Sequence, residues 1–146
     1  EKGPLKIGVF GLGIELEGLV PKVLYKNTRY QNPITKANQV AALLKEEEKC
    51  DYVIALSHLG YRYRDRQVSD VRLAENSRHV DMIIGGHTHT FIEEPLVVRN
   101  LLDEPVVINQ AGWGGILLGR MDILFERNRK NKCIGCQNIT VGAARI

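Results

Sequence analysis

The sequence has few cysteines, a small charge imbalance and no long apolar run. Its 146 residues include three cysteines, and 20 Lys and Arg against 17 Asp and Glu leave a net charge of +3. This charge is too small and too dispersed to predict a nucleic-acid polymer or an anionic membrane as a partner. Apolar runs such as residues 52–56 are far shorter than the roughly 20 residues of a membrane-spanning helix. With 44% hydrophobic residues, the composition predicts one folded domain whose core needs no disulfide or metal.

The start of the chain and its cysteines predict little. Residues 1–4 pass directly into a strand-like run, so we expect no signal peptide in this chain, and the compartment stays open. Cys133 and Cys136 form one C-x-x-C motif, whereas a zinc site of this kind needs a second pair. We predict surface or hairpin thiols beside a turn at Gly135, with a redox or disulfide role as the alternative. Cys50 stands alone.

Strand and helix patterns alternate in the first part of the chain and predict an α/β fold. Residues 6–10 are typical of a short buried strand, and Asn32 to Thr35 lead into an amphipathic helix. Residues 52–56 and 81–84 have the continuous apolar character of strands covered on both faces. The polar stretch 65–78 predicts a surface helix. The apolar stripe of the amphipathic helix consists of Ala37, Val40, Ala41, Leu43 and Leu44.

The last third of the sequence is mostly β in character. Four β-leaning runs, separated by Asn, Asp, Pro and Gly turns, predict strands at residues 96–98, 106–108, 116–125 and 134–141. No internal repeat, low-complexity tract or long linker divides the chain. We therefore expect one unit that is α/β first and mostly β afterwards.

Three histidines follow the two predicted buried strands. His58 comes after the first strand, and His87 and His89 lie in a glycine-containing loop after the second. Ligands of α/β sheets gather beyond the carboxyl ends of the strands, and imidazole is the commonest protein ligand of transition metals. With few carboxylates nearby, the set suits Zn, Mn or Fe better than Ca or Mg. By spacing alone, a hydrogen-bonded structural role stays open for each of the three.

Two further readings of the residues compete with a metal site. The run from Ile7 to Leu16 looks like a strand entering a glycine turn of a dinucleotide-binding fold, but Leu16 stands where that fingerprint needs glycine. Gly18 and Pro21 also interrupt the helix that should follow. A non-catalytic structural or interaction domain is the other alternative. His79 lies in a polar, helix-like stretch and is predicted to be solvated.

The sequence around the histidines resembles calcineurin-like metallophosphoesterases, and among them the 5'-nucleotidase group. The resemblance rests on residues 53–60 (V-I-A-L-S-H-L-G) and 83–90 (I-I-G-G-H-T-H-T). A closing segment, N-Q-A-G at 109–112 and G-G-I-L-L-G-R-M-D at 114–122, follows in the order of that group. The three matches cover most of residues 6–125, and G-G-H-T-H is the most specific of them.

The resemblance implies a fold and a metal centre. The chain would be part of a four-layer α/β/β/α sandwich with mixed sheets. His58 and His87 would bind one divalent metal ion and His89 the second, with Zn, Mn or Fe as candidates. In such a centre two ions about 3.5–4 Å apart polarise the phosphoryl group and bind the attacking hydroxide. Trp113 is assigned no role, and no residue of this chain is assigned the proton transfer.

Family motifs that precede these segments do not occur upstream of His58. They are D-x-H, G-D-x-x-D and G-N-H-[DE], which supply the remaining metal ligands and the catalytic histidine in the family. We therefore expect residues 1–146 to be the C-terminal half of a metallophosphoesterase domain, inactive alone and supplying half of a two-metal site. The parent would hydrolyse phosphate monoesters of nucleotides, with cyclic nucleotides and other phosphoesters also open as substrates.

Absence of the other half also has consequences for partners. We expect the exposed strand edges and apolar face of this half to contact the missing N-terminal half or to support self-association. We also expect these residues not to include the separate nucleotide-binding domain that is usual in the 5'-nucleotidase group, so they do not indicate which nucleotide is preferred. The resemblance favours a periplasmic or extracellular location.

Overall fold

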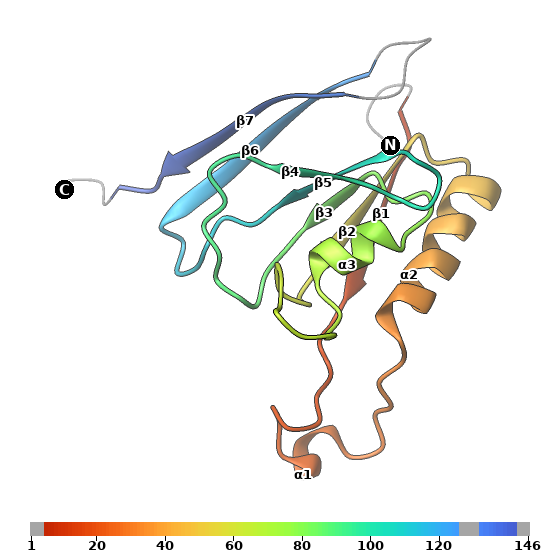
Figure 1. Cartoon of the computed structure of the whole chain (residues 1–146), viewed down its shortest axis with the longest axis vertical. Helices are drawn as coiled ribbons and strands as arrows, with labels where there is room; N and C mark the ends of the chain where they lie inside the picture. The colour runs from red at the N-terminus through yellow and green to blue at the C-terminus, as the bar shows by residue number, and fades with distance from the viewer. Residues whose placement is uncertain (1–4, 126–131, 143–146) are drawn as a thin grey trace.

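The computed structural model describes residues 5–125 and 132–142, with only the backbone described at 132–134. A five-stranded sheet in the order β1-β2-β3-β5-β4 forms its centre (Figure 1). Neighbours among β1, β2, β3 and β5 are parallel, and β4 pairs with β5 antiparallel. The sheet strands are β1 (Ile7–Leu12), β2 (Tyr52–Ser57), β3 (Met82–Ile84), β4 (Leu96–Arg99) and β5 (Pro105–Asn109). The expected α/β class and the strand patterns are confirmed.

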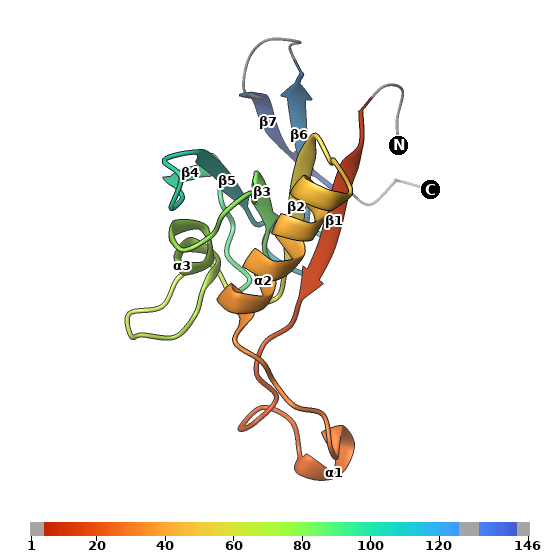
Figure 2. The ribbon, with the colours of Figure 1, turned by 90° about the vertical axis from the view of Figure 1, so that its right-hand side faces the viewer.

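Helices α2 (Pro33–Ala42) and α3 (Asp70–Glu75) lie on one side of the sheet (Figures 1 and 2). The Asn32 side chain accepts a hydrogen bond from the Thr35 N–H at 3.0 Å and so caps α2, as expected for Asn before Pro at a helix start. Ala37 and Ala41 are fully buried against the sheet. Their small side chains let the helix backbone approach the strands closely.

Two expectations about the helices need correction. The predicted stripe on α2 is narrower than expected, because Val40 and Leu43 are 36% and 46% exposed. The chain widens into a π-helical turn, η1 (Leu43–Glu47), which shifts the helical periodicity on which that stripe was predicted. Helix α3 is shorter than residues 65–78 and largely buried. His79 lies outside α3 with φ of 62°, and its Nε2 is 3.3 Å from the Glu46 carboxylate, so it is paired and only partly exposed rather than solvated.

The face of the sheet opposite α2 and α3 is covered only in part. Side chains of Tyr52, Met82 and Val107 are buried there under Met121 and Ile123 of β6 (Leu117–Leu124). On the same face, the edge strand β1 and the carboxyl ends of β2 and β3 are open: Val9 is 53%, Leu56 48% and Ile84 43% exposed. The prediction that both predicted buried strands are covered on both faces is therefore wrong at their ends. A strand with one open face can have the same continuous apolar sequence as a strand covered on both faces, so the sequence does not distinguish the two.

Strand β6 forms a separate antiparallel pair with β7 (Lys132–Thr140). The register shifts between Asp122 and Ile123, and Gly135 lies within β7, paired with Asp122, so the predicted turn at Gly135 is wrong. An irregularity in a strand pair often carries glycine, which explains why the sequence resembled a turn. The side chain of Cys133 lies outside the described residues, so the prediction for the C-x-x-C motif stays a prediction.

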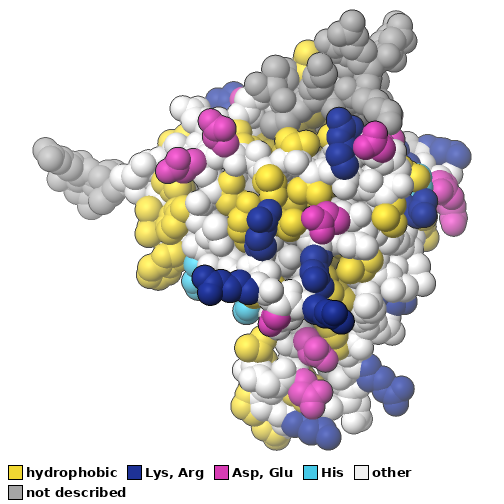
Figure 3. All heavy atoms as spheres, viewed as in Figure 1, with side chains coloured by type: hydrophobic (Ala, Val, Ile, Leu, Met, Phe, Trp, Pro, Cys, Tyr) yellow, Lys and Arg dark blue, Asp and Glu magenta, His cyan; other side chains and the backbone are white. Residues whose placement is uncertain are grey.

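Residues 13–32 form an arm that projects beyond the carboxyl end of β1 and includes the short helix α1 (Lys22–Tyr25) (Figures 1 and 2). The arm carries exposed Leu19, Val23 and Leu24, while basic and acidic side chains are interspersed over the side of the molecule in Figure 3. Within the described residues, no helix is long and apolar enough to cross a membrane.

Candidate functional site

Strands β1, β2 and β3 are parallel neighbours, so their carboxyl ends meet at one edge of the sheet. His58 directly follows β2, and its backbone N–H donates to the Leu12 carbonyl at the end of β1 at 2.9 Å. His87 follows β3 after two glycines. The imidazole rings of His58 and His87 lie with their centroids 5.2 Å apart and their planes at 69°. Histidines 29 positions apart in the chain are thus brought together by strand pairing.

A buried glutamine holds the loop that carries His87. Gln110 is 2% exposed, and its Nε2 donates to the Gly86 carbonyl at 2.8 Å. Its Oε1 accepts hydrogen bonds from the Thr90 backbone N–H and from the Thr88 hydroxyl. These bonds fix both ends of a loop in which His87 has a φ of 72°, in the left-handed region that non-glycine residues rarely adopt. The conformation that aims this ring is therefore determined by β5 and its continuation.

His89 lies in a different environment. Its ring stacks on Trp113 with centroids 5.9 Å apart and an interplanar angle of 21°, and Trp113 is 57% exposed. In residues 5–125 and 132–142, no three His, Cys, Asp or Glu side chains come together as a group that could hold a metal ion. The structure thus brings the rings of His58 and His87 together, while the ring of His89 stacks on Trp113. Trp113, to which the sequence assigned no role, contacts one of the predicted ligands.

The rings of His58 and His87 meet edge to face at a spacing that is also compatible with binding one metal ion. Because a metal lies about 2.1 Å from each bound imidazole nitrogen, two histidines on one tetrahedral ion have ring centres about 5 Å apart. The observed 5.2 Å agrees with this value. Gly86 also leaves room beside the ring, since a Cβ added there would lie 3.1 Å from His58 Nδ1. Two nitrogen donors with few carboxylates suit a borderline transition metal better than calcium.

The His58 side of this edge opens into a hollow of about 510 Å³. Leu56, Ser57 and His58 line it from β2, and Ile84 lines it from β3. The turn at residues 11–13, Gly-Leu-Gly, forms its far wall. A small substrate group therefore has access to His58 from the side of the sheet that α2 and α3 leave free.

A buried carboxyl group lies behind the two histidine turns. Asp70, the first residue of α3, is 0% exposed, and neither of its side-chain oxygens makes a hydrogen bond of standard geometry with the described residues. Burial raises the pKa of Asp70 to about 6, and the nearby Ser57 hydroxyl opposes the rise. Ionising a carboxyl group in this position is costly, so burial favours the neutral form of Asp70.

Gly85 provides the space for Asp70. A Cβ on Gly85 would overlap the Asp70 Oδ2, so we expect Gly85→Ala to lower the free energy of unfolding by about 1–3 kcal/mol through overpacking. Gly11→Ala is the matched control, because a Cβ there meets nothing within 4 Å. Urea unfolding of the two variants checks the prediction, and equal midpoints would contradict it.

Sequence reasoning missed Asp70 and Gln110. Asp70 follows Ser69, whose hydroxyl accepts from the Arg72 N–H at 3.3 Å, a helix-cap pattern that does not reveal that the acid is buried. Gln110 lay in a segment quoted for its resemblance but carried no assigned role. The dinucleotide alternative is not supported, because β1 leads into the irregular arm and the four-residue helix α1 rather than a helix starting at the glycine turn.

Comparisons with known proteins agree with one another. The family described as Calcineurin-like phosphoesterase matches residues 9–91. The chain is 35% identical over 121 residues to the trifunctional nucleotide phosphoesterase protein of Bacillus subtilis, covering 83% of this chain and 8% of that protein. It is 31% identical over 150 residues to the 5'-nucleotidase of Vibrio cholerae, covering 90% of this chain and 27% of that protein. The chain thus spans less than a third of each of these relatives.

Solved structures share the fold. The NAD nucleotidase of Haemophilus influenzae superposes with a TM-score of 0.77 at 19% identity, covering 97% of this chain and 29% of that one. The 5'-nucleotidase precursor of Thermus thermophilus gives a TM-score of 0.75 at 22% identity, covering 94% and 28%. The mixed α/β architecture expected from the sequence is the architecture found in these proteins.

Proposed function

This chain belongs to the calcineurin-like phosphoesterase family, and from that premise we propose that it is part of a metal-dependent hydrolase acting on phosphate monoesters of nucleotides. The observation that carries the proposal is the meeting of His58 and His87, with ring centroids 5.2 Å apart at the carboxyl edge of the sheet. Similarity to proteins named 5'-nucleotidase and nucleotide phosphoesterase supports the substrate class.

Family members generally use divalent metal ions. In the proposed site His58 and His87 hold one ion and His89 contributes to a second, with Zn, Mn or Fe as candidates. When bound, the ions supply Lewis acidity that polarises a phosphoryl group and lowers the pKa of a water molecule. The stacking of His89 on Trp113 distinguishes its surroundings from those of the pair, which supports its assignment to a different ion.

The remaining residues of the site orient the ligands. Gln110 holds the His87 loop through the Gly86 carbonyl and Thr90 N–H, and the backbone bond from His58 to Leu12 ties the other turn to β1. Fixed ligands of this kind bind a metal without ordering themselves first. The protein's part in the reaction is therefore to position the metal donors and to leave an open hollow for the phosphate.

We also propose that residues 1–146 form the C-terminal half of the catalytic domain. The exposed apolar side chains of Val9, Leu56 and Ile84 share one face of the sheet, and a missing half of the sandwich would cover them. The remaining metal ligands and the proton-transfer histidine would come from that half. A periplasmic or extracellular location belongs to the same proposal.

Hydrolysis of adenosine 5'-monophosphate tests the function. We expect the chain alone to have negligible activity with Mn or Zn, and a chain joined to the upstream half of a related 5'-nucleotidase domain to hydrolyse the ester. His87→Ala in the joined protein should lower the rate about 100-fold, whereas His79→Ala, a histidine paired with Glu46, should not. Robust hydrolysis by the chain alone, or no effect of His87→Ala, would contradict the proposal. An inactive joined protein would favour the non-catalytic alternative.

A further inference from the structure

A threonine that is not itself a predicted ligand joins the two histidine-bearing segments to each other. Thr88 lies between His87 and His89, and its hydroxyl oxygen accepts a hydrogen bond from the Tyr61 backbone N–H at 2.9 Å. Tyr61 belongs to the turn that begins at His58, and it lies 27 positions before Thr88 in the sequence. This bond therefore connects the turn after β2 with the loop after β3.

The hydroxyl of Thr88 uses its full hydrogen-bonding capacity in this place. It donates to the Gln110 Oε1 at 3.2 Å, and its oxygen lies 3.0 Å from the Thr90 hydroxyl. A hydroxyl group has one donor and two acceptor positions. Since the proton is donated to Gln110, the two acceptor positions are filled by the Tyr61 N–H and the Thr90 hydroxyl. Thr88 is thus bonded to three different segments of the chain at once.

The methyl group of Thr88 also lies against the turn after β2. Gly60, with a φ of 95°, is so close that a Cβ added to it would be 2.8 Å from the Thr88 Cγ2. The same Cβ would overlap the Tyr63 Oη, which donates to the Leu59 carbonyl at 2.7 Å. The turn and the loop are therefore closely packed around Thr88, and its displacement would disturb the backbone of both.

The histidines on either side of Thr88 have unusual backbone conformations. The φ of His87 is 72° and that of His89 is 52°, both in the left-handed region that non-glycine residues rarely adopt. Such conformations persist where surrounding contacts hold them. Gln110 bonds to the backbone of the loop itself, whereas Thr88 bonds to the turn that carries His58. The spacing of the His58 and His87 rings, 5.2 Å between centroids, therefore depends on the bond that Thr88 accepts.

We propose that Thr88 is a positioning residue of the metal site, whose hydroxyl sets the spacing of His58 and His87 by linking the turn that carries one to the loop that carries the other. Thr88 acts through the Tyr61 N–H and Gln110 and is not a metal ligand itself. This assignment rests on the proposed function and adds how the ligands are held at their spacing before an ion binds. Hydrogen bonds that orient metal ligands contribute to metal affinity in this way.

Nuclear magnetic resonance of the chelator-treated 146-residue chain tests the positioning without metal. Nuclear Overhauser contacts between the ring protons of His58 and His87 should be lost in Thr88→Val, which keeps the shape of the side chain but has no hydroxyl. Thr88→Ser keeps the hydroxyl and should retain these contacts. Ser77→Ala is the control for stability, because it removes another buried hydroxyl, which donates to the Ala74 carbonyl of α3 at 2.9 Å. It should leave the ring contacts unchanged.

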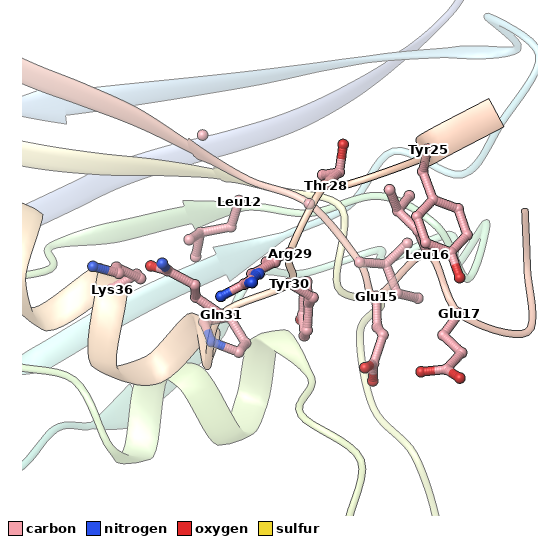
Figure 4. A pocket seen from close by; sticks show the side chains of 14 residues that line it. Leu12, Glu15, Leu16, Glu17, Tyr25, Thr28, Arg29, Tyr30, Gln31 and Lys36 are labelled. Atoms are coloured by element: carbon pink, nitrogen blue, oxygen red, sulfur yellow. The ribbon is translucent and has the colours of Figure 1, made fainter. Parts of the chain in front are cut away.

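Zinc titration of the same proteins measures the consequence for binding. Thr88→Val should raise the dissociation constant of zinc about 10–100-fold, because ligands that must first be ordered bind more weakly. Thr88→Ser should stay close to the unaltered chain. Thr28→Val makes the same substitution in the arm, where Thr28 lines the hollow between the arm and the start of α2 (Figure 4). This variant should change neither the ring contacts nor zinc binding.

Three results would overturn the assignment. The first is persistence of the ring contacts in Thr88→Val, and the second is zinc binding through His58 and His87 that Thr88→Val leaves unchanged. The third is an equal loss of ring contacts in Ser77→Ala, which would indicate a general loss of stability. Because the ring contacts are measured without metal, they test Thr88 independently of the proposed function. Ring contacts that depend on Thr88 in a chain that binds no zinc would reject the metal site and leave the effect of Thr88 on the histidine spacing standing.

Discussion

Replacing Asp70 with asparagine is expected to stabilise the fold by about 2–3 kcal/mol at pH 8. Burial raises the pKa of Asp70 from 3.8 to about 6, so the folded state binds the proton more tightly than the unfolded chain. The resulting stability is fully present below about pH 4 and is lost as the pH rises through about 6. Asparagine keeps the size of the side chain but cannot ionise, so this loss should disappear.

Urea unfolding between pH 4 and 8 measures the effect. The difference in unfolding free energy between the variant and the unaltered chain should grow between pH 4 and 6 and then level off. Burial also raises the pKa of Asp81, but both proteins share that group, so it cancels in the difference. Asp65→Asn, at an exposed acid on the preceding loop, is the control. Parallel stability curves for Asp70→Asn and the unaltered chain would refute the buried-acid interpretation.

Gln110→Ala is expected to lower stability by about 2–4 kcal/mol and to weaken metal binding about 10–100-fold. The variant removes the partner of the Gly86 carbonyl, the Thr90 N–H and the Thr88 hydroxyl, of which the first two belong to the loop's backbone. Without these hydrogen bonds, the left-handed conformation of His87 is less strongly stabilised.

Thermal unfolding and metal titration of the same samples separate the two effects. Gln39→Ala removes an exposed glutamine of α2 whose side chain accepts from Lys36, and it should change neither quantity. If Gln110→Ala loses stability but binds metal as tightly as the unaltered chain, the loop conformation does not control the ligands, and Gln110 has a purely structural role.

Much of the fold could be predicted from local patterns. The strands at residues 52–56 and 81–84 and the helix after Asn32 follow from apolar runs and one cap, which are short-range signals. The sequence could not predict which face of each strand is covered by another layer. Leu56 and Ile84 are as apolar as buried neighbours, and only the three-dimensional position of β6 decides which part of that face is covered.

The histidines of the candidate site could be selected from the sequence, but the residues that support them could not. His58 and His87 were predicted as ligands of one ion because the sequence around them resembles a family, and strand pairing brings their ring centroids to 5.2 Å from each other. Their binding of metal stays a prediction. Asp70 acts through burial, and Gln110 acts through hydrogen bonds to residues 20–24 positions away in the sequence, neither of which a local pattern reports. The partner of His79, Glu46, lies 33 positions away and was missed for the same reason.

Metal binding by the chelator-stripped chain tests the central claim most directly. Titration with Mn and Zn should give close to one ion per chain, because the paired histidines form one of the two expected half-sites. Binding should be lost in the triple variant with His58, His87 and His89 replaced by alanine, and in His58→Ala or His87→Ala alone, but kept in His79→Ala. Metal binding that is absent, or that is unchanged in the triple variant, would contradict the assignment of these histidines as ligands.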